Sequence, residues 1–396
     1  MISEKMLRLL GGNSAIRAMF EEGNRLAALY GRENVYDFSL GNPNFPAPDA
    51  VKDAITHILQ TEESTMVHGY MSNAGYPDVR AAVAASLNGR FRTNYTQENI
   101  LMTVGAAGGL NVILKTLLNP GDEVLVIAPY FVEYGNYVSN YDGVLRAVPA
   151  LPDSFLPDVD ALAAAVTERT KAVLINSPNN PTGVVYGADT VRALSSMLER
   201  RQRELGTSIY LLADEPYREL CYDGAEVPWL PDYYPNTVVC YSWSKSLSLP
   251  GERIGYLVLP GTLQDAELVT GAAAIANRVL GFVNAPSLMQ RAVARCLDAS
   301  TDVEGYSENR RLLLEGLEAC GFTCTHPCGA FYLWMRSPVP DEKSFVQKAK
   351  EYNLLLVPGS SFAGPGYVRL AYCVSPDMIR RSLPAFRKLA ADYNLI

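Results

Sequence analysis

Five short apolar runs in the middle of the chain constrain its fold more than any other feature. They lie at 122–129 (DEVLVIAP), 171–178 (KAVLINSP), 209–217 (IYLLADEPY), 237–245 (TVVCYSWSK) and 254–260 (IGYLVLP). Nearly continuous apolar strands are typical of a sheet that helices cover on both faces. Helical patterns at 158–168 and 189–205 separate some of the runs. We therefore predict an α/β fold with a mostly parallel sheet flanked by helices.

The pattern changes near residue 290. A helical stretch at 308–321 precedes predicted strands at 329–336, 354–360 and 367–375 and a final helix at 378–394. This order is typical of a smaller α+β unit, and 396 residues are enough for one large and one small domain. We predict a large domain at 47–290, and a small domain formed by 291–396 together with an N-terminal arm at 1–46.

Charge and cysteine content limit the partners and the compartment. The net charge is −8 at pH 7 and the chain has no basic cluster, which argues against a nucleic-acid partner and favours a small-molecule ligand. No apolar stretch has the length of a signal-peptide core or a membrane span. The odd number of cysteines, seven, fits a reducing compartment, so we expect a cytoplasmic protein without membrane contact.

One cysteine-rich stretch has two interpretations. Cys320, Cys324, His326 and Cys328 have spacings that a zinc site tolerates. However, Phe322 and Cys324 alternate with polar residues as in a half-buried strand, and cysteine is often a buried side chain. We favour a strand and a turn here, and predict no metal.

Polar side chains follow three of the apolar runs. They are Asn176 and Asn180, then Asp214 and Tyr217, then Ser242, Ser244 and Lys245. Ligands of open α/β sheets bind outside the carboxyl ends of the strands. We therefore expect these side chains to converge on one crevice.

The third run suggests a particular chemistry. A lysine in such a crevice forms a Schiff base when burial and nearby cations lower its pKa, and Ser242 and Arg253 would bind a phosphate beside Lys245. The small residues of 103–111 (TVGAAGGLN) lead into a helix whose free N–H groups favour a phosphate. The alternatives are a solvated loop for the two cations and close helix packing for the small residues.

Asp214 and its neighbours fit a pyridine ring. A buried acid needs a partner, and a protonated pyridine nitrogen would provide one while the ring withdraws electrons. Tyr217 and Asn180 could donate hydrogen bonds to a phenolic oxygen of that ring. Alternatively, Asp214 caps the following helix.

The motifs together resemble a known family. The segments GNPNFPAP (41–48), NSPNNPTG (176–183), ADEPY (213–217), SWSKSLSLPGERIGY (242–256) and YVRLAYCVS (367–375) resemble the class I/II pyridoxal-phosphate aminotransferases, the aspartate aminotransferase-like family of fold type I. The resemblance implies that Lys245 forms the Schiff base, that Asp214 partners the ring nitrogen, and that pyridoxal 5'-phosphate is the cofactor. The other cofactor-binding residues that it implies are Asn180 and Tyr217 at the ring hydroxyl, Ser242, Ser244 and Arg253 near the phosphate, Gly105, Ala106 and Ala107 as a backbone cradle, and Phe131 stacked on the ring.

The resemblance also implies a homodimer and a substrate site. Tyr70 resembles the tyrosine that reaches the phosphate of the neighbouring subunit, and Arg369 resembles the arginine that binds the substrate α-carboxylate with Asn180 and the backbone at Gly41. Arg278 has nearly the placement of an arginine that reaches across the dimer to a side-chain carboxylate. The expected reaction moves an amino group between an L-amino acid, such as aspartate or another dicarboxylic or aromatic one, and a 2-oxo acid.

Two other functions are open to a chain with these motifs. A C–S β-lyase or related enzyme uses the same cofactor, because the cofactor carries the chemistry and the protein selects the bond that breaks. A transcription regulator built on this fold would need an added basic domain, and the first 40 residues are too few and too weakly basic for one.

Overall fold

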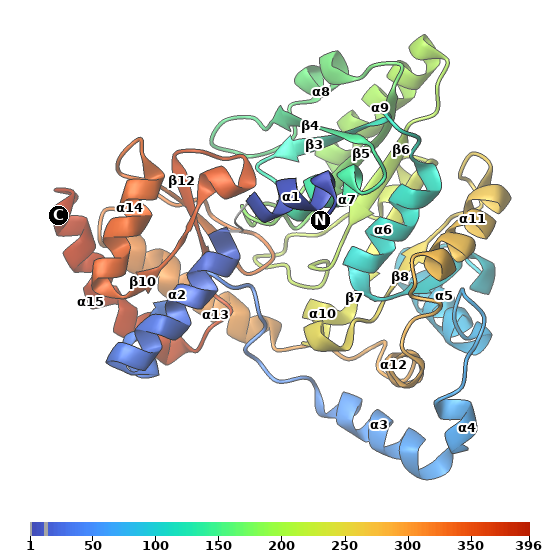
Figure 1. Ribbon diagram of the computed structural model, residues 1–396, viewed down its shortest axis with the longest axis horizontal. Coiled ribbons are helices and arrows are strands. Elements are labelled where there is room, and N and C mark those ends of the chain that lie inside the picture. The colour runs from blue at the N-terminus through green and yellow to red at the C-terminus, as the bar shows by residue number, and fades with distance from the viewer. Residues whose placement is uncertain (1, 12–14) are drawn as a thin grey trace.

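Three β-sheets organise the chain in the computed structural model, which describes residues 2–11 and 15–396 (Figure 1). The central sheet has seven strands in the order β2-β8-β7-β6-β5-β3-β4, and only β8 runs antiparallel to its neighbours. Its strands are β2 (Ile100–Thr103), β3 (Glu123–Ala128), β4 (Val144–Pro149), β5 (Thr170–Asn176), β6 (Tyr210–Asp214), β7 (Thr237–Ser242) and β8 (Gly255–Val258). The predicted mostly parallel sheet is confirmed.

Burial on both faces explains why these strands are apolar without a break. In β5, Val173 and Ile175 pack into one core, whereas Ala172 and Leu174 pack into the core on the opposite face. Successive side chains of a strand point to opposite faces, so every position of such a strand must be apolar.

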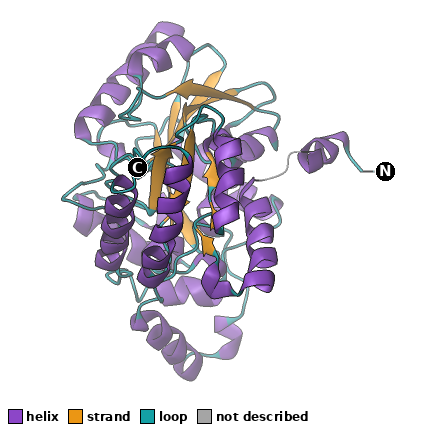
Figure 2. Cartoon of the chain, turned by 90° about the vertical axis from the view of Figure 1, so that its left-hand side faces the viewer, coloured by secondary structure: helices purple, strands orange, loops and turns teal. Residues whose placement is uncertain are grey.

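Helices cover both faces of the central sheet, as Figure 2 shows. One face carries α6 (Gly105–Leu117), α7 (Glu133–Ser139) and α11 (Ala266–Val279). The other face carries α3 (Asp49–Thr61), α5 (Pro77–Phe91), α8 (Val159–Ala165), α9 (Ala188–Leu205) and α12 (Ser287–Val293). None of the described helices is long and apolar enough to cross a membrane.

A second core forms around two smaller sheets. One has the antiparallel order β11-β12-β9, from Val357–Pro358, Tyr367–Ala371 and Tyr332–Arg336, and the other pairs β1 (Tyr36–Asp37) with β10 (Leu354–Leu355) in parallel. The helices that pack here are α2 (Ala15–Tyr30), α13 (Val303–Glu318), α14 (Glu342–Ala349) and α15 (Pro376–Asp392). Val35 and Phe38 also pack in this core, which joins the beginning of the chain to its end. The domain limits at 46/47 and 290/291 stay a prediction.

Short elements complete the chain. The remaining α-helices are α1 (Glu4–Gly11), α4 (Ser64–Val67) and α10 (Trp243–Ser246). The 3-10 helices are η1 (Arg32–Asn34), η2 (Gln97–Asn99), η3 (Leu230–Asp232), η4 (Pro250–Glu252), η5 (Lys350–Tyr352) and η6 (Gly359–Phe362).

Two details of the C-terminal unit differ from expectation. The strand predicted at 354–360 is divided, because β10 and β11 belong to different sheets and η6 follows directly. The stretch around Phe322 and Cys324 is no strand: Cys324 makes one isolated bridge to Met335, and the Phe322 ring packs against Phe345 and Phe386 in the core. Across the described residues, no group of three or more His, Cys, Asp or Glu side chains is placed to hold a metal ion.

Candidate active site

One cavity of about 360 Å³ lies where β5, β6 and β7 end, between the central sheet and the C-terminal unit. It collects most of the side chains that the sequence singled out, although they are up to 328 positions apart between Gly41 and Arg369. The predicted residues in its lining are Gly41, Ala106, Ala107, Phe131, Asn180, Asp214, Tyr217, Ser242, Ser244, Lys245, Arg253 and Arg369.

Three predicted residues are not part of the cavity lining: Gly105, which directly precedes Ala106 on α6, and also Tyr70 and Arg278. Tyr70 is 92% exposed, and Arg278 is exposed in the last turn of α11. Neither lines the cavity. Their expected roles across a dimer stay a prediction.

Lys245 lies on α10, the single helical turn after β7, and its side chain is partly buried. Its Nζ donates a hydrogen bond to the backbone oxygen of Gly41 at 2.8 Å. Burial lowers the pKa of Lys245 to about 8; nearby Cys373 opposes this shift, while the positive charges of Arg253 and Arg369 add to it. A neutral amine is the nucleophilic form, so this environment prepares Lys245 for attack on a carbonyl group.

This pKa gives a prediction for the cofactor-free protein. The rate at which it forms a covalent bond with pyridoxal phosphate should rise about tenfold per pH unit below pH 8 and level off above it, since only the neutral amine reacts. Stopped-flow absorbance after mixing would follow the reaction. A midpoint near 10.5, the ordinary lysine value, would contradict the effect of burial.

Asp214 is the last residue of β6, and only one of its two carboxylate oxygens has a hydrogen-bond partner. Tyr134, for which no role was predicted, donates a hydrogen bond from its Oη to Asp214 Oδ2 at 2.5 Å. Asp214 Oδ1 is buried and has no hydrogen-bond partner in the described structure. Burial raises the pKa of Asp214 to about 7; the Tyr134 hydrogen bond opposes this shift and the charge of Glu215 adds to it. A buried carboxylate oxygen without a partner is suited to a hydrogen-bond donor, and a cationic donor would favour the charged form of the acid.

Asn176 connects the backbone at Asp214 to the backbone at Asn180. Its Nδ2 donates to the Asp214 backbone oxygen at 2.8 Å, and its Oδ1 accepts from the Asn180 backbone N–H at 2.7 Å. Its side chain thus joins the ends of β5 and β6. The sequence placed Asn176 in the crevice by position, and only the contacts give it this structural task.

The opposite end of the cavity is suited to an anion. Gly105 begins α6 with a φ of +76°, and a Cβ there would come within 3.0 Å of Arg253 Nη2, so the backbone and the guanidinium approach closely. Ser242 accepts a hydrogen bond from the Ser244 N–H at 3.2 Å, and the two hydroxyl groups are 2.6 Å apart. Helix N-terminal N–H groups, hydroxyl groups and an arginine together favour a phosphate.

Arg369, on β12 of the C-terminal unit, lines the active-site cavity. Its Nη1 donates to Asn180 Oδ1 at 3.0 Å, its Nη2 donates to the Ser39 backbone oxygen at 2.6 Å, and its Nε is buried without a partner. The guanidinium lies over the rings of Tyr332 and Phe362, at 4.5 and 4.6 Å. This packing fixes the plane of the Arg369 guanidinium, and a guanidinium can bind both oxygens of a carboxylate that lies in its plane.

Tyr332 is a second residue that the sequence did not identify. Its Oη lies 3.0 Å from Tyr217 Oη, and a side chain at position 41 would collide with it. Gly41 is therefore required for close approach of the N-terminal segment. The contacts of Tyr134 with Asp214 and of Tyr217 with Tyr332 join distant parts of the chain, and no local sequence pattern indicates them.

A phosphorylated pyridine aldehyde satisfies the unmet groups of this cavity together, since its ring nitrogen suits Asp214 Oδ1, its phosphate suits the start of α6 and its aldehyde suits Lys245. The fold and the cavity define a pyridoxal-phosphate-dependent transferase. Residues 33–386 match the family described as aminotransferase class I and II. The chain belongs to this family and is a transaminase that acts on amino acids and 2-oxo acids.

Individual relatives agree with this assignment. A probable aspartate/prephenate aminotransferase of Thermus aquaticus is 34% identical over 351 residues, which cover 87% of this chain and 89% of that protein. The structure resembles an aminotransferase from Eubacterium rectale with a TM-score of 0.97 and 45% identity, covering 100% of this chain and 99% of the other. Aspartate aminotransferase from Thermus thermophilus with maleate has a TM-score of 0.87 and 30% identity, covering 98% and 99%. These relatives favour amino-group transfer over the lyase alternative.

Proposed function

We propose that this transaminase takes a dicarboxylic amino acid of the aspartate type as donor and binds its α-carboxylate on Arg369. The observation that carries the proposal is the fixed, buried guanidinium of Arg369, whose Nε has no partner. Names of relatives that include aspartate aminotransferase support the same donor class.

The side-chain carboxylate of such a donor needs a cation from outside the chain. The lysine and arginine residues in the cavity lining are Lys245, Arg253 and Arg369, and each already has a proposed partner. We assign the remaining role to Arg278 of the neighbouring subunit, because it is exposed at the end of α11.

We also propose the cofactor contacts. Asp214 holds a proton on the ring nitrogen, Asn180 and Tyr217 hold the ring oxygen, and Ser242, Ser244, Arg253 and the backbone of Gly105, Ala106 and Ala107 hold the phosphate, with Phe131 against the ring. When bound, pyridoxal phosphate withdraws electrons from the substrate α-carbon. Lys245 Nζ then accepts the α-proton, and its lowered pKa suits an amine that gains and loses a proton near neutral pH.

A panel of amino acids tests the donor class. Aspartate should bleach the absorbance of the lysine-bound cofactor faster than neutral donors, and a 2-oxo acid should restore it. Arg278→Gln should lower kcat/KM for aspartate by about 30-fold, or about 2 kcal/mol, because a buried carboxylate loses its partner, and should leave alanine nearly unchanged. Equal losses for both donors would contradict the role of Arg278. Pyruvate and ammonia released from a cysteine conjugate without a 2-oxo acid would support a lyase instead.

We propose a homodimer with shared active sites, located in the cytoplasm. The location is supported by seven free cysteines, which fit a reducing compartment. The dimer is supported by Tyr70, because no hydrogen bond connects its hydroxyl to the rest of the described chain while 92% of the residue is exposed.

Hybrid dimers test the shared site. Mixing Lys245→Ala chains with Tyr70→Phe chains should restore about one quarter of wild-type activity, because half of the dimers are hybrids and each hybrid has one site with both native residues. Steady-state assays after subunit exchange, with hybrids verified by mass spectrometry, measure this recovery.

The control for this experiment places both substitutions on the same chain. Wild-type chains mixed with Lys245→Ala/Tyr70→Phe chains form hybrids in which the site that keeps Lys245 lacks the Tyr70 hydroxyl, so these hybrids should show only impaired activity. Verified Lys245→Ala and Tyr70→Phe hybrids without recovery would show that Tyr70 acts within its own chain or not at all.

A further inference from the structure

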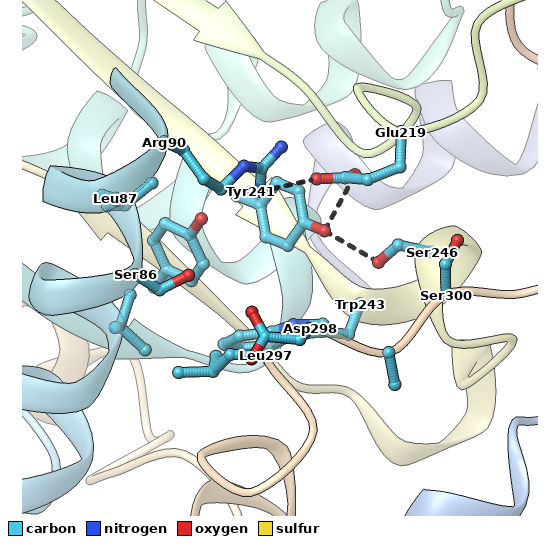
Figure 3. Close-up of a pocket in the computed structure, with 13 residues that line it drawn as sticks. Ser86, Leu87, Arg90, Glu219, Tyr241, Trp243, Ser246, Leu297, Asp298 and Ser300 are labelled. Carbon is cyan, nitrogen blue, oxygen red and sulfur yellow. Dashed lines mark hydrogen bonds and ion pairs between the residues drawn. The ribbon is translucent and has the colours of Figure 1, made fainter. Parts of the chain in front are cut away.

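A second cavity, of about 260 Å³, lies behind the helical turn that carries Lys245 (Figure 3). Its walls come from α5, β7, β8, the residue Glu219 after β6, and the segment 297–300. Helix α10 separates the two cavities: Trp243 and Ser246 line this one, whereas Ser244 and Lys245 line the active site. Nothing in the proposed reaction uses the residues of this second cavity.

An incompletely bonded ion pair lies on one side of the cavity. Arg90 Nη1 is 3.1 Å from Glu219 Oε1, but the two are not aligned as a hydrogen bond, and Glu219 Oε1 is buried without a donor. The other oxygen, Oε2, accepts from Tyr241 Oη at 2.9 Å, as Figure 3 shows. The Arg90 side chain is 41% exposed and donates no hydrogen bond to any described residue. Arg90 and Glu219 are therefore paired by charge, but their alignment leaves hydrogen-bonding capacity on both side chains unused.

This pairing suits a ligand that carries an ammonium and a carboxylate close together. The guanidinium fork of Arg90 is suited to bind a carboxylate in a planar, bidentate manner, and an ammonium would pair with the Glu219 carboxylate, which also lines the cavity. An α-amino acid bears both groups on one carbon atom. A simple anion would pair with Arg90 alone, and a simple amine would pair with Glu219 alone.

The rest of the cavity suits an uncharged side chain. Tyr241, Trp243 and Tyr256 pack with ring centroids 4.9 to 5.6 Å apart, and Leu87 and Leu297 extend this apolar surface. Asp298 lies opposite Arg90 and Glu219 in Figure 3 and is exposed. Its carboxylate would repel an acidic side chain, so the cavity is better suited to ligands without a second carboxylate.

We propose that this cavity is a second binding site, which takes a neutral α-amino acid with an apolar or aromatic side chain. The cavity is slightly smaller than the usual range for drug-sized ligands, about 300–1,000 Å³, which fits a small metabolite. The ligand would touch the Lys245-bearing turn and the segment that leads into α13, where Thr301 N donates to the Ser246 backbone oxygen at 2.7 Å. It is therefore distinct from the substrate site and adjacent to it.

Fluorine NMR with 4-fluoro-L-phenylalanine tests this site. The holoenzyme is first treated with borohydride, which fixes the cofactor to its lysine and stops turnover of the probe. Arg90→Gln should weaken binding by about tenfold or more, because a charge-assisted contact is lost, whereas Arg203→Gln on the surface of α9 should not. 3-(4-Fluorophenyl)propionate and 4-fluorophenethylamine, which lack the ammonium and the carboxylate, should each bind about tenfold more weakly.

Two further variants show whether the probe binds in the second cavity or in the active site. Arg369→Gln should leave this binding intact; binding lost in Arg369→Gln and retained in Arg90→Gln would assign the probe to the active site and overturn the proposal. Ser86→Phe fills the cavity from α5 without removing a charge, so it should abolish binding while circular dichroism stays native. Undiminished binding to a folded Ser86→Phe protein, or no binding to the unsubstituted holoenzyme, would also overturn it.

Discussion

Lys245→Ala is expected to lower kcat for amino-group transfer by about 10⁴-fold or more, since it removes both the nucleophile and the group that moves the α-proton. The fold should persist, because the replaced amine is a poorly solvated cation whose pKa burial lowers to about 8. Cofactor should still bind without a covalent bond, held by the contacts proposed for Asp214 and Arg253. Steady-state kinetics and the absorbance of bound cofactor measure the two effects.

The matched control is Lys171→Ala. Lys171 lies on β5, and its Nζ is 4.0 Å from a carboxylate oxygen of Asp122, far from any proposed cofactor contact. Its replacement should leave kcat within about twofold, as is usual for surface positions. Borohydride reduction of the unsubstituted enzyme followed by peptide mapping should place the label on Lys245, and a label on any other lysine would refute the assignment.

Asp214→Asn is expected to cost about 10²–10³-fold in kcat, or about 2.7–4 kcal/mol, the usual effect of removing one preorganised electrostatic contact. Asparagine keeps the shape of the side chain and can still accept the Tyr134 hydrogen bond, but it has no negative charge to hold a proton on the ring nitrogen. The wild-type carboxylate has a pKa raised to about 7 in the cofactor-free chain, so a cationic partner should stabilise its charged form.

Comparison with Tyr134→Phe separates charge from hydrogen bonding. That variant keeps the carboxylate and removes the donor to Oδ2, so its loss should be about tenfold, smaller than that of Asp214→Asn. Single-turnover rates with aspartate, together with melting temperatures, show whether the losses arise in the chemical step. Near-normal turnover of Asp214→Asn would exclude a charged contact to the ring.

The sequence predicted the five strands that lie inside the central sheet and missed the two at its edges, β2 and β4. Strands β3, β5, β6, β7 and β8 are almost entirely apolar, and each was predicted within a few residues. Strand β4 was not predicted because it lies at the edge of the sheet, where only Val148 is buried and its other residues meet solvent at least in part. The segment 354–360 was predicted as one strand because residue type does not reveal that a chain changes sheets halfway.

The sequence by itself determined which reactive side chains follow the strands of the central sheet, and the tertiary structure decided the contacts of these side chains. Asn180, Asp214 and Lys245 follow strands of the central sheet, so their convergence follows from the rule that ligands bind at the carboxyl ends of strands. Arg369 lies within β12 of another sheet, and only the family resemblance indicated its place at the site. Only the fold brings Tyr134 to Asp214, Tyr332 to Tyr217 and Arg90 to Glu219, because these pairs depend on how helices and a second unit pack over the sheet. Local periodicity fixes which face a side chain occupies, whereas its partner across a core depends on packing between distant segments.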